Sequence, residues 1–245
     1  MFVAILSGAL LGLVMAVLVV HMRIDQTVAG IGLTMSLTGL VYYAYRLMFA
    51  GASVPHIDNF ATIPIPILSE IPLIGQALFN QYALTYVAYI LVPMLAVVLA
   101  KTPFGLALRT VGENPQAAAG SAIDVIQTRT IAVIVAGAFA SLAGAYLSLA
   151  VFGSFTFGII SGRGWICLAL VVLGRWNPVA CALAAFLFGA VDAFQLRMQT
   201  SGITDLPYPL FLALPYVATL IAMIASSKRA LMPASLMKPY DPEER

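Results

Sequence analysis

Side chains that could do chemistry are few in this sequence and lie far apart. The two histidines, His21 and His56, fall in connections that the predicted topology places on opposite sides of a membrane, so they cannot act together. No GxSxG, HExxH or paired-cysteine motif is present, and no Walker A pattern GxxxxGK[ST] for ATP. We therefore expect no catalytic residue, no metal site and no cofactor bound by this chain. Any energy from ATP must come from a partner.

Polar side chains within apolar segments form a second group of candidates. Because ionisable groups in a bilayer are costly, Asp192 and Arg163 should face a cavity or each other. A structural pair, between these two or with Arg197, or an interface position is favoured over contact with a solute. Hydroxyl and amide groups suit weak binding of a small polar solute. The candidates for a solute pathway are Thr34, Ser36, Thr38, Asn177, Asp192 and Gln195.

The rest of the chain is strongly apolar. Of 245 residues, 62% are hydrophobic and 9% are charged, whereas about a quarter of the residues in a soluble domain are charged. The mean hydropathy is +1.00. The net charge of +2 and the scattered basic residues argue against a nucleic-acid partner. We expect an integral membrane protein in contact with lipid, with Cys167 and Cys181 as packing residues.

Apolar runs predict an all-α, polytopic transmembrane helical bundle, since about 20 helical residues cross about 30 Å of hydrocarbon. The fifth run is the weakest because Arg163 interrupts it, and a re-entrant half-helix is the alternative there. In the first run, Gly8 and Gly12 form a small-xxx-small pair that suits close helix packing. The seven predicted spans are 2–20, 27–46, 83–100, 130–150, 159–174, 178–195 and 208–226.

Basic residues, which accumulate in cytoplasmic loops, predict an N-terminus outside and a C-terminus inside. Seven crossings leave only Arg46, Arg163 and Arg197 outside among the 12 basic residues. The cytoplasmic segments are then 101–129 and the tail 227–245. The proline-rich segment 50–82 is external, either a surface for a solute-delivering partner or a packed cap. A start outside the membrane is explained if preceding spans are missing from this chain.

The longest cytoplasmic loop, 101–129, is predicted to contain a short helix. Asn114 is placed as the N-cap and Pro115 as the first helical residue, with a stop at Gly120 and Ser121. Two turns of helix are marginal alone in water, so neighbouring spans or a partner must stabilise them. The helix is either an ordinary loop element or a contact through which a partner moves the spans.

This loop resembles the coupling loop GENPxAA of permease subunits in ABC importers for simple sugars, nucleosides and branched-chain amino acids. Segments 19–36, 161–199 and 238–245 are also similar, and the nucleoside branch is the most similar. The resemblance implies a single permease domain over 1–245 that contacts an ATPase through its coupling residues. These residues are Gly112, Glu113, Asn114, Pro115, Gln116, Ala117, Ala118, Ala119 and Gly120.

The same resemblance implies partners. They are an ATP-binding subunit that carries ATP and Mg²⁺, a second permease subunit in a homodimer or heterodimer, and an external solute-binding lipoprotein at the bacterial inner membrane. Family members are usually longer, with additional N-terminal spans. The alternatives are a permease for branched-chain amino acids and a secondary transporter or channel without an ATPase. A secondary transporter would need ionisable residues near mid-span, and none is well placed there.

Overall fold

A computed structural model describes residues 1–49, 60–66, 74–160, 162–201, 217, 220–221, 224 and 232–241. Most of the described residues are helical, as expected for a polytopic bundle. Five helices in this part of the chain are long and apolar enough to cross a membrane. They are Phe2–His21, Gln26–Phe49, Ala83–Lys101, Val125–Val151 and Pro178–Met198, and they match five of the seven predicted spans.

The other two predicted spans are not matched by long helices in the described part of the chain. Within 159–174 the structure has α8, Arg163–Leu173, whose 11 residues reach only about 16 Å at 1.5 Å per residue. This helix is shorter than a crossing requires, as the interruption by Arg163 indicated. Most of the predicted span 208–226 lies outside the described residues. The number of crossings and their orientation stay predictions.

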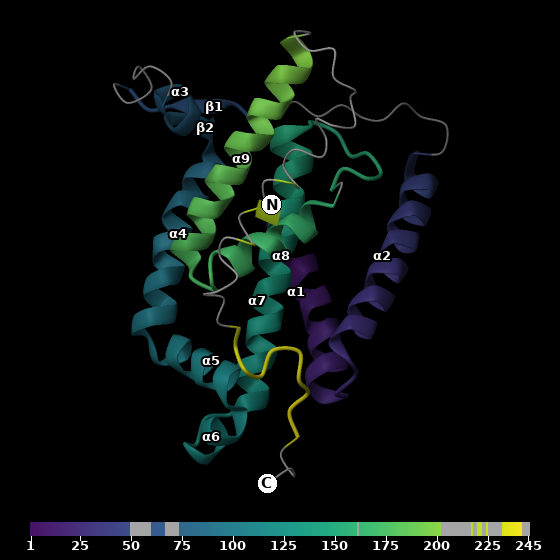
Figure 1. Ribbon diagram of the computed structural model, residues 1–245. Coiled ribbons are helices and arrows are strands. Elements are labelled where there is room, and N and C mark those ends of the chain that lie inside the picture. Colours follow the sequence, from purple (N-terminus) through teal and green to yellow (C-terminus); the bar gives the residue numbers. More distant parts are fainter. Residues whose placement is uncertain are drawn as a thin grey trace. The chain divides into compact units, whose positions relative to one another are not determined.

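The chain divides into two compact units. The first comprises Met1–Tyr89, Leu99–Ile159 and Ala234–Arg245, and the second comprises Ile90–Val98 and Ile160–Pro233. The first unit is built around two helices that lie side by side, α1 (Phe2–Ala16) and α7 (Val125–Tyr146) (Figure 1). Each continues into one wider turn, η1 (Val17–His21) and η3 (Leu147–Val151).

Small residues allow α1 and α7 to approach closely. A Cβ atom added at Gly8 would collide with the backbone of Gly137 and the side chain of Ser141, and one added at Gly12 would lie 2.8 Å from the Val133 oxygen. In lipid, where no hydrophobic force drives helices together, this backbone proximity is a main source of helix association. The close packing predicted for the Gly8 and Gly12 pair is therefore confirmed.

The helix α2, Gln26–Phe49, begins at a capped end. Asp25 Oδ1 accepts hydrogen bonds from the backbone N–H groups of Thr27 (2.8 Å) and Val28 (3.1 Å). Near the other end of α2, the Tyr45 ring packs against Phe155 and Phe157 of the segment after η3. Local capping and aromatic packing thus fasten both ends of α2.

Short elements replace a continuous helix in the described part of the predicted external segment. They are β1 (Thr62–Pro64), α3 (Ile74–Phe79) and β2 (Asn80–Tyr82), followed directly by α4 (Ala83–Lys101). The two strands pair antiparallel, with Ile63 opposite Gln81. A proline in a helix interior removes a hydrogen bond and clashes with the preceding turn, so the prolines of this segment disfavour one continuous helix. This small sheet is an addition to the expected all-helical bundle.

The second unit contains a helical hairpin of α8 and α9, Pro178–Ser201. A tight turn joins them, in which Arg175 and Trp176 have φ values of 54° and 56°. At Gly174 an added Cβ would lie 2.5 Å from Cys181 Sγ. Cys181 therefore packs against the turn, in agreement with the packing role expected for this cysteine.

Candidate functional site

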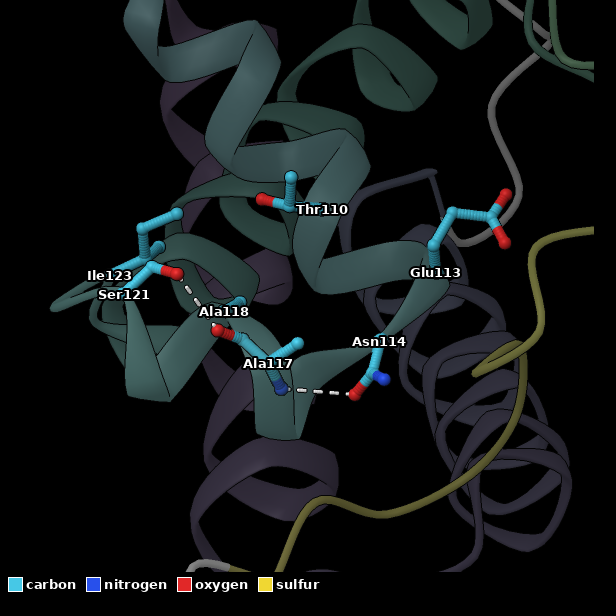
Figure 2. A pocket seen from close by; sticks show the side chains of 7 residues that line it. All are labelled: Thr110, Glu113, Asn114, Ala117, Ala118, Ser121 and Ile123. Carbon is cyan, nitrogen blue, oxygen red and sulfur yellow. Dashed lines mark hydrogen bonds between the residues drawn. The ribbon is translucent and has the colours of Figure 1, made fainter.

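The predicted short helix is present, and its first turn is capped as expected. It is α6, Pro115–Gly120, and it follows α5, Pro103–Glu113, after a single extended residue, Asn114. The Asn114 Oδ1 atom accepts a hydrogen bond from the Ala117 N–H at 3.0 Å (Figure 2). An N-cap of this kind satisfies one of the N–H groups that the first turn leaves without a helical partner.

The last turn of α6 ends in a Schellman motif. The Ile123 N–H donates to the Ala118 oxygen, and the Ala122 N–H donates to the Ala119 oxygen, both at 3.1 Å. Ala122 occupies the left-handed position of this motif, with φ of 59°. The predicted stop at Gly120 and Ser121 is confirmed, although the left-handed residue is an alanine, which the sequence pattern did not reveal.

Burial of α6 is one-sided. Ala118 is 2% exposed and forms a small core with Val111 of α5 and Val125 of α7, which are 2% and 3% exposed. Ile123 and Tyr240 pack against this core. The opposite face of α6 is solvent-exposed, and its exposed residues are Gln116, Ala117, Ala119 and Gly120. A smooth surface of small side chains is therefore held outward by a compact apolar base.

A cavity of about 200 Å³ lies beside α6 (Figure 2). Residues of α5, α6 and the turn that follows line it: Thr110, Glu113, Asn114, Ala117, Ala118, Ser121 and Ile123. Glu113 is the one charged lining residue, and its carboxylate points away from the other lining side chains (Figure 2). Ser121 Oγ donates to the Ala117 oxygen at 3.1 Å. Its size and lining suit an inserted side chain of another protein better than a whole solute molecule, since small-molecule pockets measure about 300 Å³ or more.

The C-terminal segment lies against the same site, a contact that the sequence pattern did not predict. The Ser235 N–H donates to the Gly112 oxygen at 3.0 Å, and Ser235 Oγ donates to the Glu113 oxygen at 3.3 Å. Gln116 Nε2 donates to the Asp241 oxygen at 3.3 Å. The one sequence signal for such packing was an aromatic residue, Tyr240, within a polar tail, because an aromatic ring gains free energy by covering an apolar surface.

Two arginines from elsewhere in the first unit also reach the tail. Arg129, in the first turns of α7, donates to the Lys238 oxygen at 3.0 Å and lies over the Tyr240 ring. Arg23, between η1 and α2, forms an ion pair with Asp241 at 3.0 Å. The predicted topology requires Arg23, Arg129 and the tail on one side of the membrane, and the contacts agree with that requirement.

The solute-pathway candidates of the first unit are three hydroxyl residues on α2. Thr34, Ser36 and Thr38 are exposed, and each hydroxyl donates to the backbone oxygen four residues earlier, at 2.7, 2.8 and 2.7 Å. With its O–H bonded to the backbone, such a hydroxyl can face lipid without an unsatisfied donor. Its oxygen can still accept a hydrogen bond from a solute. These residues therefore suit either lipid or a solute.

The three solute-pathway candidates of the second unit differ from one another in burial and in hydrogen bonding. Asn177 caps α9, since its Oδ1 accepts from Val179 N–H at 3.0 Å. Asp192 is half-buried, and the ion pair with Arg163 or Arg197, one of the two structural roles considered for it, is not formed in the described part of the chain. Gln195 is 4% exposed, and its Oε1 atom has no hydrogen-bond partner among the described residues. A buried acceptor without a partner costs free energy and requires an explanation.

The coupling candidates all belong to the first unit, and the pathway candidates belong to both units. Gly112 to Gly120 form one continuous feature of the first unit, whereas the six pathway residues belong three to each unit. Among the described residues, no group of three or more His, Cys, Asp or Glu side chains could hold a metal ion.

Comparison with known proteins identifies relatives over almost the whole chain. The family model of the permease component of branched-chain amino acid transport systems matches residues 1–225. The guanosine ABC transporter permease protein NupQ of Bacillus subtilis is 33% identical over 97% of this chain and 75% of its own length. The nucleoside ABC transporter permease protein NupC of Lactococcus lactis is 34% identical over 95% of this chain and 75% of its own length.

An archaeal relative is similar to the same extent. The putative glucose ABC transporter permease protein TsgC13 of Haloferax volcanii is 35% identical over 97% of this chain and 70% of its own length. No solved structure is significantly similar to the chain. All three relatives are named as permeases of ABC transporters, in agreement with the expectation that this chain is a transport subunit. Permeases of ABC transporters work with ATPase and substrate-binding partners.

Proposed function

Because this chain belongs to the family of permease components of branched-chain amino acid transport systems, we propose that it forms the membrane pathway of an ATP-driven importer for nucleosides. It is a multi-pass integral membrane protein and a transport subunit. In the proposed assembly, an ATPase binds the outward face of α6, a second permease copy or homologue completes the pathway, and an external binding lipoprotein delivers the solute. ATP and Mg²⁺ bind the ATPase.

The construction of α6 carries the proposal. A helix of six residues has no independent stability in water, yet here it is capped at both ends and held by Val111 and Val125. Its buried side packs on these valines, and its exposed side presents Ala117 and Ala119. Small residues permit a partner to approach the backbone closely, so this face suits rigid docking of another protein.

Nucleosides are proposed as the solute because two relatives, similar over nearly the full chain, carry guanosine and nucleoside in their names. A nucleoside offers several hydrogen-bonding groups, and the buried Gln195 Oε1 supplies an acceptor for them. The glucose permease relative makes a simple sugar the second candidate. Uptake of labelled guanosine, glucose and leucine into proteoliposomes, each competed by the other two, separates these solutes.

The ATPase contact is tested at α6 itself. Replacing Asn114 to Ala119 by a Gly-Ser linker of equal length should abolish co-purification of the ATPase and solute-stimulated ATP hydrolysis. At the exposed Ala119, Ala119→Trp should block docking, while the matched control Ala119→Ser should leave it intact. Solute uptake that continues unchanged after ATP depletion would exclude the proposed function in favour of a secondary transporter or channel.

A further inference from the structure

We infer that residues 234–241, here called the strap, position α6 by fastening it to the helices on either side, so that movement imposed on α6 reaches the membrane spans. The inference rests on the proposed function. The strap contacts α5, α6, α7 and the connection between η1 and α2, all within the first compact unit.

A mechanical problem makes such a fastening necessary. Two non-helical joints flank α6: Asn114, which is extended with φ of −146° and ψ of 95°, and Ala122, which is left-handed. Ala118 is the one buried residue of α6, so this short helix between two joints can pivot on that contact when a partner pulls it. Force would then be absorbed in the joints instead of tilting α5 and α7 as rigid bodies.

The strap spans both joints. On the α5 side, Ser235 binds the Gly112 and Glu113 oxygens, which precede Asn114. On the α7 side, Arg129 binds the Lys238 oxygen, beyond Ala122. Between them, the Asp241 oxygen accepts from Gln116 of α6 itself. One continuous segment therefore holds the elements before, within and after the jointed region.

Apolar packing and charge reinforce these hydrogen bonds. The Tyr240 ring packs against the core of Val111, Ala118 and Val125, to which α5, α6 and α7 each contribute one residue. The Arg129 guanidinium carbon lies 5.9 Å from the centre of this ring, within the range of a cation–π contact. The ion pair of Asp241 with Arg23 extends the fastening to the connection that follows the first span.

The first experiment measures how firmly α6 is held, without an ATPase or solute. A nitroxide label at Ala119→Cys, in a background with Cys167→Ala and Cys181→Ala, reports the mobility of α6 by electron paramagnetic resonance. Truncation after Pro233 and the variant Arg129→Gln should increase that mobility. Truncation after Asp241, which keeps the strap, is the matched control. A label at Gly32→Cys, where a side chain meets open space on α2, should not change.

The second experiment measures coupling in the complex with the ATPase in proteoliposomes, with labelled guanosine as the probe. Truncation after Pro233 and Arg129→Gln should keep ATPase binding and ATP hydrolysis but reduce the guanosine imported per ATP hydrolysed. Arg23→Asp or Asp241→Arg alone should reduce the ratio, and the double variant should restore it. A merely structural role would change the amount of folded protein and leave this ratio unchanged.

The outcomes separate the two proposals. An immobile label in the truncated chain, or an unchanged ratio of import to hydrolysis, would overturn the positioning role of the strap. Loss of ATPase binding in all strap variants would also overturn it, because the strap would then be part of the docking surface. If the label becomes mobile as expected while the unaltered complex imports guanosine without ATP, the proposed function fails and the positioning of α6 stands.

Discussion

Arg129 and Lys238, 109 residues apart in the chain, are joined by a hydrogen bond of 3.0 Å from Arg129 Nη1 to the Lys238 backbone oxygen. A charged donor makes a stronger bond than a neutral one, and the acceptor is a backbone atom that any residue at position 238 would supply. The strap therefore depends on Arg129 more than on the side chain of Lys238. In the mobility experiment, Lys238→Ala should leave the label at position 119 as immobile as in the unaltered chain, whereas an increase equal to that of Arg129→Gln would contradict this.

Removing the α6 cap should weaken the docking helix. Asn114→Ala loses the bond to the Ala117 N–H and should destabilise the helix by about 1 kcal/mol, whereas Asn114→Asp keeps an acceptor at the same position. We expect weaker binding of the purified ATPase to the alanine variant in a titration. Equal affinity for both variants would mean that the cap does not contribute to the docking surface.

The α1 and α7 contact should tolerate no added carbon at Gly137. Its Cβ would collide with the Gly8 backbone and lie 2.9 Å from Gly12 Cα, so Gly137→Ala should destabilise the protein by about 1–3 kcal/mol. Gly144→Ala on the same helix, where nothing lies within 4 Å, is the control and should be neutral or slightly stabilising. The thermal unfolding midpoint in detergent measures both, and an equal fall in the two variants would contradict the close approach of these helices at Gly137.

Protonation of Asp25 should weaken the start of α2 only in strong acid. The backbone N–H groups of Val28 and Thr27 hold the pKa of Asp25 below its ordinary value of 3.8. Because the folded-state pKa is depressed, its contribution to stability is complete above the ordinary pKa and is lost as the pH falls through the lower folded value. The thermal midpoint of Asp25→Asn should show less pH dependence than the unaltered chain below about pH 4, and identical curves would refute this.

Gln195 should matter for transport and not for stability. Gln195→Leu removes a buried acceptor that has no partner among the described residues, so the free energy of unfolding should stay the same or rise by about 1 kcal/mol. Guanosine uptake should nevertheless fall, with a higher KM. Gly189→Ala on the same helix, where an added carbon meets open space, is the control and should leave uptake unchanged. Unaltered uptake kinetics in Gln195→Leu would remove Gln195 from the pathway.

Features that depend on neighbours in sequence were predictable. The start of α6 follows from Asn114 and Pro115, because a capping side chain reaches an N–H only three residues ahead. The helices matching five predicted spans follow from apolar runs of sufficient length. The Gly8 and Gly12 pair indicated close packing, but not that Gly137 of α7 is the partner.

Contacts between residues that lie far apart in the sequence could not be predicted in this way. The ion pair considered for Asp192 is not formed with Arg163 or Arg197 in the described part of the chain. Arg163 is on another helix, and two helices bring such residues together only at the required rotation. Arg197 lies five residues along α9 itself, whereas side chains three or four residues apart are the neighbours on a helix. Asn177 is different: it precedes Pro178 as Asn114 precedes Pro115, so its cap on α9 follows from a local pattern. Its place in the pathway stays a prediction. Of these outcomes, only the one for Asp192 and Arg163 depends on how two helices pack.

Local patterns in the chain were enough to establish that it is a membrane protein, where most of its long helices lie and where α6 begins and ends. These properties depend on local hydrophobicity and on hydrogen bonds a few residues long. The position of residues 234–241 across α5, α6 and α7, with Tyr240 against their shared core, became apparent only in the folded chain. This contact joins segments more than 100 residues apart, and such contacts depend on how the intervening helices pack.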